Sequence, residues 1–208
     1  MAKLYFNYSS MNAGKSTVLL QASYNYLERG MNTLLLIAAF DERAGRGRIA
    51  SRIGLAADAD IFHAKDDLFG HIERANANAP LHAVFVDEAQ FLTEDQVWQL
   101  AKVADRIKIP VMCYGLRTDF QGKLFPGSAA LLALADNLKE IKTICWCGRK
   151  ATMVARLDAE GRFVEEGDQV VIGGEEAYVS LCRHHWTMRA LRGEQAERPG
   201  QARSSSAA

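Results

Sequence analysis

The feature that most constrains this chain is a short segment near its N-terminus that combines glycine, lysine and hydroxyl residues. Gly14-Lys15-Ser16-Thr17 follows a strand-like apolar run over residues 3–8 and begins a helical pattern over residues 15–29. Phosphate-binding loops occur in this strand, loop and helix context, because backbone amides and the N-terminus of the helix point at the same phosphate oxygens. The segment therefore predicts a nucleotide-binding α/β protein.

Each residue type in this loop has a task in nucleotide binding. We expect Lys15 to reach the β- and γ-phosphates, Ser16 to ligate Mg²⁺ through its hydroxyl, and Thr17 to start the helix proper. Ser9 stands where the motif has its first glycine, so a turn with positive φ at Ser9 would carry a modest penalty. The alternative interpretation is a chance strand, turn and helix with a surface lysine. The loop residues expected at the nucleotide are Ser9, Ser10, Met11, Asn12, Ala13, Gly14, Lys15 and Ser16.

Strand-like and helical patterns alternate along the N-terminal part of the chain. Apolar runs lie at residues 3–8, 33–39, 83–86 and 111–115, and helical patterns lie near 15–29, 66–77 and 94–106. This alternation predicts an α/β fold of the P-loop NTPase type, with helices flanking a mostly parallel sheet. Arg29-Gly30 mark the end of the first helix, and Pro110 opens the strand after the third.

Two adjacent carboxylates follow the apolar run at residues 83–86. Asp87 and Glu88 would lie at the carboxyl end of a strand, where ligands gather in open α/β sheets. Asp87 would hold Mg²⁺ directly or through water, and Glu88 would act as the base on the oxygen that attacks the γ-phosphate. Without Lys15 and Ser16, we would prefer a solvated strand end in which Glu88 caps the next helix. The pair does not decide whether the attacking oxygen belongs to water or to a bound alcohol.

Two close groups of metal-ligand residues occur after residue 142. Cys145 and Cys147 form the first group, and Cys182 with His184 or His185 forms the second. Three thiolates and one imidazole suit a tetrahedral zinc site, and a Cys-x-x-His spacing favours His185 over His184. Protein would fill all positions, so we expect structural Zn²⁺ rather than a catalytic metal. The alternative is a set of buried thiols and surface histidines.

These patterns divide the chain into three parts. Residues 1–141 are expected to form the nucleotide-binding domain and residues 142–191 a small zinc-bound β subdomain. Residues 192–208 are rich in Gly, Ser, Ala and charge without an apolar face, so we expect a disordered tail. Cys113 lies inside an apolar run and is expected to pack in the core as a free thiol.

The charge balance argues against one class of partner. Lys and Arg (25) equal Asp and Glu (25), so the chain lacks the positive field with which non-specific nucleic-acid binders gather phosphates. The N-terminus has no secretory-signal pattern, and the apolar runs are too short to cross a bilayer. We therefore expect a cytoplasmic protein with reduced thiols, no nucleic-acid partner and no membrane partner.

Four segments taken together resemble the type II, zinc-containing thymidine kinases of bacteria. They are MNAGKST at 11–17, VDEAQF at 86–91, YGLRTDF at 114–120, and VIGG at 171–174 before Tyr178 and Cys182. The similarity spans about residues 3–187, and the order and spacing of the segments are more specific than any single motif. The resemblance implies transfer of the γ-phosphate of ATP to the 5′-hydroxyl of thymidine, which gives dTMP for nucleoside salvage and DNA synthesis.

The resemblance also implies roles for particular residues. Glu88 would be the general base on the thymidine 5′-hydroxyl, and Lys15 would serve the phosphates. Asp41 and Arg43 would lie near the phosphates, where Arg43 could stabilise the transferring charge, although a flexible basic loop is the alternative for this segment. The cofactor-binding set extends to Asp87, Glu88, Ala89 and Gln90.

By the same resemblance, the segment around residues 171–178 forms a lasso loop over the thymine base. Main-chain amides and carbonyls of the lasso would pair with the pyrimidine edge, and apolar side chains would line the base and sugar pocket. For those apolar side chains, simple core packing is the alternative. The expected substrate-binding residues are Met11, Phe91, Leu116, Phe120, Val171, Ile172, Gly173, Gly174 and Tyr178.

The resemblance finally implies a structural use of zinc and an oligomer. Zinc would tie Cys145 and Cys147 to Cys182 and His185, so its loss should remove nucleoside binding before ATP binding. Relatives suggest a homotetramer with dTTP as feedback inhibitor.

Two other functions fit parts of the pattern: a P-loop ATPase with a zinc ribbon that acts on nucleic acid, and a zinc module whose P-loop is a nucleotide switch.

Overall fold

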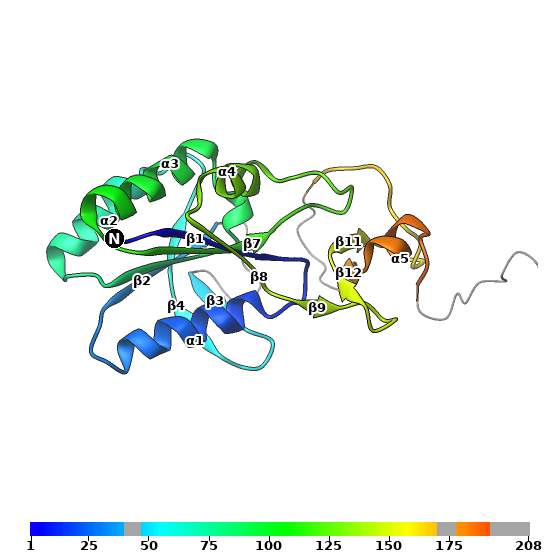
Figure 1. Ribbon diagram of the computed structural model, residues 1–208, viewed down its shortest axis with the longest axis horizontal. Coiled ribbons are helices and arrows are strands. Elements are labelled where there is room, and N and C mark those ends of the chain that lie inside the picture. The colour runs from blue at the N-terminus through cyan, green and yellow to red at the C-terminus, as the bar shows by residue number, and fades with distance from the viewer. Residues whose placement is uncertain (40–46, 170–177, 192–208) are drawn as a thin grey trace, which may run out of the picture.

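The computed structural model describes residues 1–39, 47–169 and 178–191. It has a larger α/β part and a smaller β-rich part at the other end of the molecule (Figure 1). The larger part is built on a parallel six-stranded sheet with the order β5-β2-β6-β7-β1-β8. Its strands are β1 (Leu4–Ser9), β2 (Thr33–Ala38), β5 (Asp60–Phe62), β6 (Ala83–Asp87), β7 (Val111–Leu116) and β8 (Asn137–Glu140). The predicted α/β fold with a mostly parallel sheet is confirmed.

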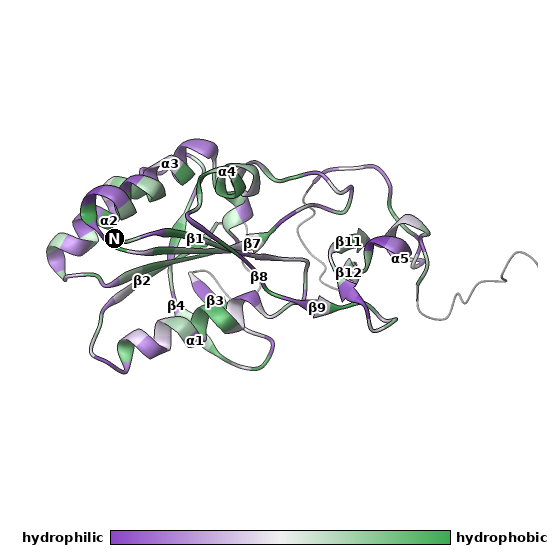
Figure 2. Cartoon of the chain, in the orientation of Figure 1, coloured by the Kyte–Doolittle hydropathy of each residue, from purple (hydrophilic) through white to green (hydrophobic). Residues whose placement is uncertain are grey.

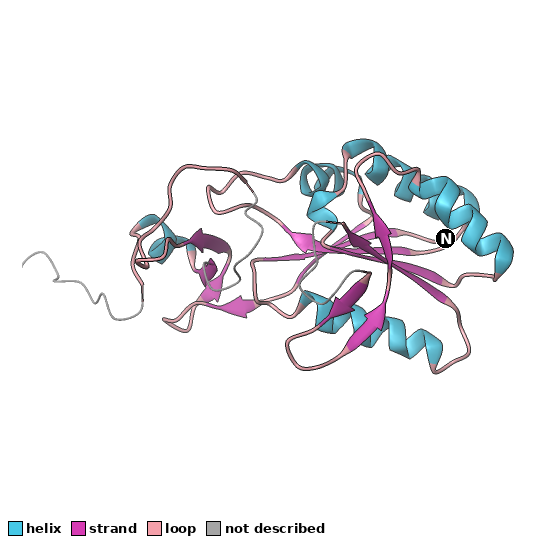
Figure 3. Cartoon of the chain, turned by 180° about the vertical axis from the view of Figure 1, so that it is seen from behind, coloured by secondary structure: helices cyan, strands magenta, loops and turns pink. Residues whose placement is uncertain are grey.

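Helices cover both faces of this sheet. Helix α1 (Lys15–Leu27) lies on one face, and α2 (Leu68–Asn78), α3 (Glu94–Lys102) and α4 (Pro126–Leu134) lie on the other (Figure 1 and Figure 3). Successive residues of β2 point to opposite faces, since Leu36 packs in the core beneath α2, α3 and α4 while Leu35 and Ile37 pack beneath α1. Burial on both faces explains the continuous apolar runs, which Figure 2 shows as green strands between helices with purple segments.

The helix ends follow local capping chemistry. The Asp67 carboxylate accepts a hydrogen bond from the Gly70 N–H (3.0 Å) and caps α2, and Thr93 with Gln96 forms a capping box at the start of α3. Helix α3 continues into a π-helical turn, η2 (Val103–Ile107), which ends at Lys108 with a φ of 64°. All three predicted helices are therefore present.

Several elements have no sequence pattern from which we could predict them. Strands β3 (Arg48–Ala50), β4 (Ala56–Asp58) and β5 have three residues each, which is too short for a period to be detected. Helix α4 is apolar on all sides because it packs against both α3 and the 3₁₀ turn η1 (Ala89–Phe91). Strand β8 is mostly polar, and within the described ranges β1 is its sole partner, at the edge of the sheet.

The smaller part consists of two antiparallel strand pairs and one short helix. Strand β9 (Thr143–Ile144) pairs with β10 (Lys150–Ala151), β11 (Met153–Arg156) pairs with β12 (Tyr178–Leu181), and α5 (Arg183–Thr187) follows. Among its described residues, the buried core is a cluster of Cys145, Ala151, Ala155, Leu181 and Cys182, and Val154 is buried as well. Such a core buries little apolar area, so this part needs another source of stability.

Two sequence expectations remain open in this description. The domain boundary at residue 142 stays a prediction, and the predicted tail at residues 192–208 lies outside the described residues. Among residues 1–39, 47–169 and 178–191, no helix combines the length and the apolar character that crossing a bilayer demands.

Candidate functional site

The glycine- and lysine-containing loop joins β1 to α1 at the carboxyl edge of the sheet. Positive φ angles fall at Asn12 (59°) and Gly14 (82°), whereas Ser9 is the last residue of β1. Ser9 therefore does not carry the conformational penalty of a positive φ, because the turn with positive φ comes three residues later, at Asn12. Helix α1 begins at Lys15 rather than at Thr17, with Gly14 as its N-cap. The first turn of the helix thus directs its amides toward the loop.

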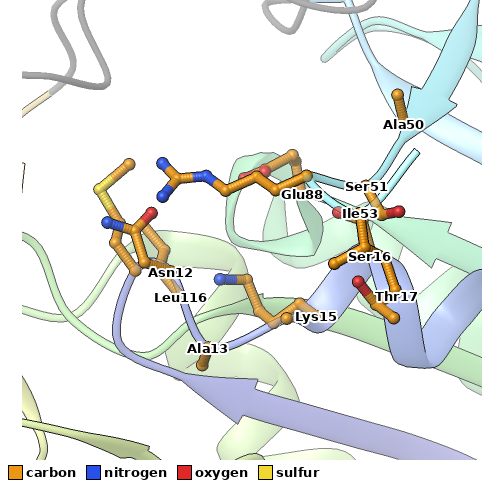
Figure 4. A pocket seen from close by; sticks show the side chains of 13 residues that line it. Asn12, Ala13, Lys15, Ser16, Thr17, Ala50, Ser51, Ile53, Glu88 and Leu116 are labelled. Atoms are coloured by element: carbon orange, nitrogen blue, oxygen red, sulfur yellow. The ribbon is translucent and has the colours of Figure 1, made fainter. Parts of the chain in front are cut away.

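This loop forms one wall of a cavity of about 410 Å³ (Figure 4). Lys15 is only 8% exposed, and its Nζ donates a hydrogen bond to the Ser10 carbonyl (3.4 Å). The Ser10 hydroxyl is buried and has no hydrogen-bond partner within the part of the chain that the structure describes. A buried cation beside an unsatisfied hydroxyl and a helix N-terminus fits phosphate oxygens well. The cavity is lined by Met11, Asn12, Ala13, Gly14, Lys15, Ser16, Thr17, Ala50, Ser51, Arg52, Ile53, Glu88 and Leu116.

The first carboxylate of the acidic pair, that of Asp87, contacts the Ser16 side chain. Asp87 ends β6, is 2% exposed, and accepts a hydrogen bond from the Ser16 hydroxyl. Burial and the neighbouring Glu88 charge raise the pKa of Asp87 to about 7, against the opposing effects of the Ser16 hydroxyl and the Lys15 charge. Adjacent hydroxyl and carboxylate oxygens are ligands that Mg²⁺ accepts, so Ser16 and Asp87 together could hold a divalent cation.

Asparagine at position 87 is expected to stabilise the nucleotide-free protein at alkaline pH. The folded chain keeps the Asp87 proton up to about pH 7, whereas the ordinary value is 3.8. Between these values the folded state binds more protons than the unfolded state, so stability falls as the pH rises. Because Asn cannot ionise, Asp87→Asn should raise Tm by about 2–4 °C at pH 8.

Thermal unfolding without nucleotide or metal, recorded from pH 5 to pH 8, measures this effect. The advantage of Asp87→Asn over the native protein should grow as the pH rises toward 7. An advantage that stays constant across this range, or a loss of stability at pH 8, would show that burial does not hold the Asp87 proton.

The second carboxylate belongs to a residue with unusual backbone geometry. Glu88 has φ 50° and ψ 40°, in the left-handed region, and it lines the cavity while being 9% exposed. The Glu88 side chain makes no capping bond to η1, which contradicts the alternative of a helix cap. Instead, its Oε2 accepts a hydrogen bond from Gln90 Nε2. Ala89 and Gln90 are buried and are not among the residues that line the cavity.

The predicted substrate residues fall into three groups. Met11 and Leu116 line the cavity, as expected. Phe91 packs edge-on against Phe125, with ring centroids 5.9 Å apart. The Phe120 ring packs against the Arg156 guanidinium, with 5.4 Å between the ring centroid and Arg156 Cζ. Arg156 of β11 pairs in turn with Tyr178 of β12. Asp41, Arg43, Val171, Ile172, Gly173 and Gly174 lie outside the described residues.

One wall of the cavity was missed by sequence reasoning. Residues 50–53, in the hairpin between β3 and β4, face the phosphate loop across the cavity (Figure 4). The hairpin is held there because Ile49 is buried beneath α1. Of residues 50–53, Arg52 alone is charged. Its positive charge was the one sequence feature that could have pointed to a place beside bound phosphates.

The cysteine and histidine cluster assembles as predicted at the junction of the two strand pairs. Cys145, Cys147, Cys182 and His185 place one ligand atom each within 4.8 Å of one another. The Nδ1 atom of His185 lies 3.4 Å from Cys145 Sγ and 3.6 Å from Cys182 Sγ, and the sulfurs of Cys147 and Cys182 are 3.9 Å apart. A tetrahedral site with Zn–S bonds near 2.3 Å has edges of about 3.8 Å, so this donor set fits zinc.

The chemistry of the cluster also suits a metal. Burial by itself raises the pKa of the Cys145 thiol, but backbone N–H groups of Cys147 and Cys182 and the His185 ring outweigh burial and lower the pKa to about 6. A thiolate available at neutral pH is the form that binds zinc. Of the two histidines, His185 is the one that lies in the cluster, and its ring stacks on Trp146 with centroids 4.1 Å apart.

Side-chain hydrogen bonds join the small part to the large one on both sides of residues 170–177. Before this segment, Gln169 Nε2 donates to Asp119 Oδ2 (2.9 Å), and after it, Ser180 Oγ donates to the Met11 carbonyl (2.5 Å). Trp186 Nε1 donates to the Phe120 carbonyl (3.2 Å). Gln169 is thus tied to the loop after β7, and Ser180 is tied to the phosphate loop.

Comparisons with known proteins agree on one family. The family model described as thymidine kinase matches residues 2–186. A thymidine kinase of Rhizobium meliloti (strain 1021) is 68% identical over 195 residues, which cover 93% of this chain and 100% of that protein. A thymidine kinase of Agrobacterium fabrum is 67% identical over 186 residues, which cover 89% and 96%. A thymidine kinase of Shewanella oneidensis is 60% identical over 186 residues, which cover 89% and 97%.

Proposed function

The chain belongs to the thymidine kinase family, and we propose that it phosphorylates thymidine with ATP bound on its phosphate loop and Glu88 as the general base. It is an enzyme of the phosphotransferase class, in keeping with its similarity to bacterial thymidine kinases. The observation that carries the mechanism is the cavity in which Lys15, Ser16 and Glu88 face one another. In this proposal Lys15 serves the donor phosphate, Ser16 the metal and Glu88 the acceptor hydroxyl.

We propose the following division of labour for the transfer. Lys15 and the amides of residues 12–16 hold the β- and γ-phosphates, while Ser16 and Asp87 would hold Mg²⁺, which supplies charge neutralisation when bound. Glu88 accepts the proton of the 5′-hydroxyl, and the alkoxide oxygen bonds to the γ-phosphorus as the bond to the β,γ-bridging oxygen breaks. The products are dTMP, ADP and a proton. Arg43, from the family resemblance, would stabilise the transferring charge.

We propose that thymidine binds between the cavity and the small part of the molecule. Met11 and Leu116 form the near wall at the cavity, and Phe120 and Tyr178 lie toward β11 and β12. The lasso at residues 171–174 would close over the base with its main chain, because glycines 173 and 174 allow close approach. The fixed positions of Gln169 and Ser180 support this placement.

Further properties follow from the family and remain proposals. We propose structural Zn²⁺ on the cysteine and histidine cluster, a homotetrameric assembly, and feedback inhibition by dTTP. A cytoplasmic location is proposed because three thiolate ligands persist best under reducing conditions.

The direct test is phosphate transfer from γ-labelled ATP, with magnesium, to each of the four deoxynucleosides and to water. Labelled dTMP with little product from the other nucleosides is expected. Labelled inorganic phosphate as the sole product would overturn the proposal and favour an ATPase. Label on all four nucleosides would retain the kinase and overturn the specificity for thymidine.

A further inference from the structure

A buried glutamine next to the candidate base has both ends of its amide engaged. Gln90 is 1% exposed, and its Nε2 donates a hydrogen bond to Glu88 Oε2. Its Oε1 accepts a hydrogen bond from the Leu116 N–H (2.9 Å). Gln90 therefore bridges the carboxylate of Glu88, which precedes η1, and Leu116, the last residue of β7. Leu116 itself lines the cavity, so the bridge joins two walls of the site.

Two glycines make room for this bridge. A Cβ added at Gly115 would lie 2.9 Å from both Gln90 N and Gln90 Oε1, and one at Gly127 would lie 2.6 Å from the Ala89 carbonyl oxygen. Neither glycine has a positive φ, so close packing rather than backbone conformation requires them. Ser128 Oγ adds a hydrogen bond to the Leu116 carbonyl (2.6 Å). The surroundings thus fix both the amide of Gln90 and the strand end that it contacts.

The residue that Gln90 holds needs such support. Glu88 occupies the left-handed region without being glycine, a strained conformation that persists only where the surroundings enforce it. Its carboxylate also sits at the end of three rotatable bonds. A base displaced by about 1 Å can lose about 100-fold in rate. A fixed donor at one carboxylate oxygen removes this rotational freedom.

We propose that Gln90 is a positioning residue that orients the Glu88 carboxylate toward the acceptor hydroxyl and ties it to the substrate wall at Leu116. This inference rests on the proposed role of Glu88 as general base. Gln90 is not among the residues that line the cavity. Its main effect on turnover should therefore pass through the Glu88 carboxylate to which it donates.

A double-mutant cycle of Gln90→Met and Glu88→Gln tests this route. Methionine keeps the approximate volume of glutamine and removes both hydrogen bonds. Gln96→Met is the matched control, because Gln96 is also 1% exposed and bonded at both ends of its amide, to His63 and to Thr93, but belongs to the cap of α3. Turnover is expressed per ATP-binding site, so unfolded protein does not count, and Gln90→Asn serves if Gln90→Met does not fold.

In the native background, Gln90→Met should lower kcat about 10- to 100-fold while KM for ATP changes less than about 3-fold. With Gln already at position 88, the same change should lower the residual kcat less than about 3-fold. Gln96→Met should reduce Tm while leaving kcat within about 2-fold.

The outcomes separate this inference from the function on which it rests. Equal losses of kcat in both backgrounds would mean that Gln90 acts without Glu88, which overturns the positioning role and leaves the base intact. A Glu88→Gln protein with native turnover would overturn the base itself. A loss from Gln96→Met as large as that from Gln90→Met would reduce the effect to general destabilisation and would also overturn the inference.

Discussion

Replacing Glu88 with glutamine is expected to lower kcat about 10³-fold while leaving ATP affinity within about 3-fold. Glutamine has nearly the shape of glutamate, and its carbonyl oxygen can still accept the hydrogen bond from Gln90. The loss therefore isolates the proton-accepting carboxylate from the geometry around it. Lys15 and Ser16, which serve the donor phosphates, are untouched. Steady-state kinetics and ATP titration of the same preparation measure both quantities.

Glu94→Gln is the matched control for this change. Glu94 lies in the first turn of α3 and is exposed, so the same loss of one negative charge should leave kcat within about 2-fold. If Glu88→Gln turned over at the native rate, the nucleotide would be a switch ligand or another group would be the base. If ATP affinity fell together with kcat, Glu88 would contribute to donor binding rather than to proton transfer.

The strands that could be predicted are those buried on both faces. The runs at residues 33–39, 83–86 and 111–115 are apolar without interruption because helices cover each side of the sheet. Strand β8 could not be predicted, since its residues Asn137–Glu140 are mostly exposed and become a strand only by pairing with β1. Its extended conformation depends on a partner more than 100 residues away in the sequence, which no local pattern reports.

The sheet edge that carries the candidate site was predictable for the same topological reason. The phosphate loop and the acidic pair each follow a strand, and parallel strands bring their carboxyl ends to one edge, so Lys15, Ser16 and Asp87 were expected to meet. The position of residues 50–53 was not predictable, because it depends on burial of Ile49 beneath α1. The sequence placed Gln90 in the cofactor-binding set, and its bridge from Glu88 to Leu116 was not predictable, because Leu116 ends a strand that is distant in sequence.

Replacing His185 with alanine tests the role of the metal cluster in the small part of the molecule. His185→Ala should weaken zinc binding and raise the dissociation constant for thymidine at least about 100-fold, while ATP binding changes little. The physical reason is the small size of the core around the cluster, where the described residues supply two of the ligand cysteines and three other clustered buried apolar residues. Below such a size, metal binding supplies the folding free energy. Strand β12 ends directly before Cys182. Loss of zinc from the His185→Ala variant would free Cys182 from the metal and so release one end of the proposed lasso.

His184→Ala provides the comparison, because His184 is adjacent in sequence but is not one of the clustered ligands. It should retain stoichiometric zinc and native thymidine affinity. Zinc content by mass spectrometry, with calorimetric titration of thymidine and of ATP, distinguishes the two variants. Loss of ATP binding in parallel with thymidine binding would mean that the small part supports the whole fold, because the phosphate loop would then need the Ser180 contact to Met11 to keep its shape. Native thymidine affinity without zinc would instead show that the contacts of Gln169 and Ser180 fix the lasso unaided.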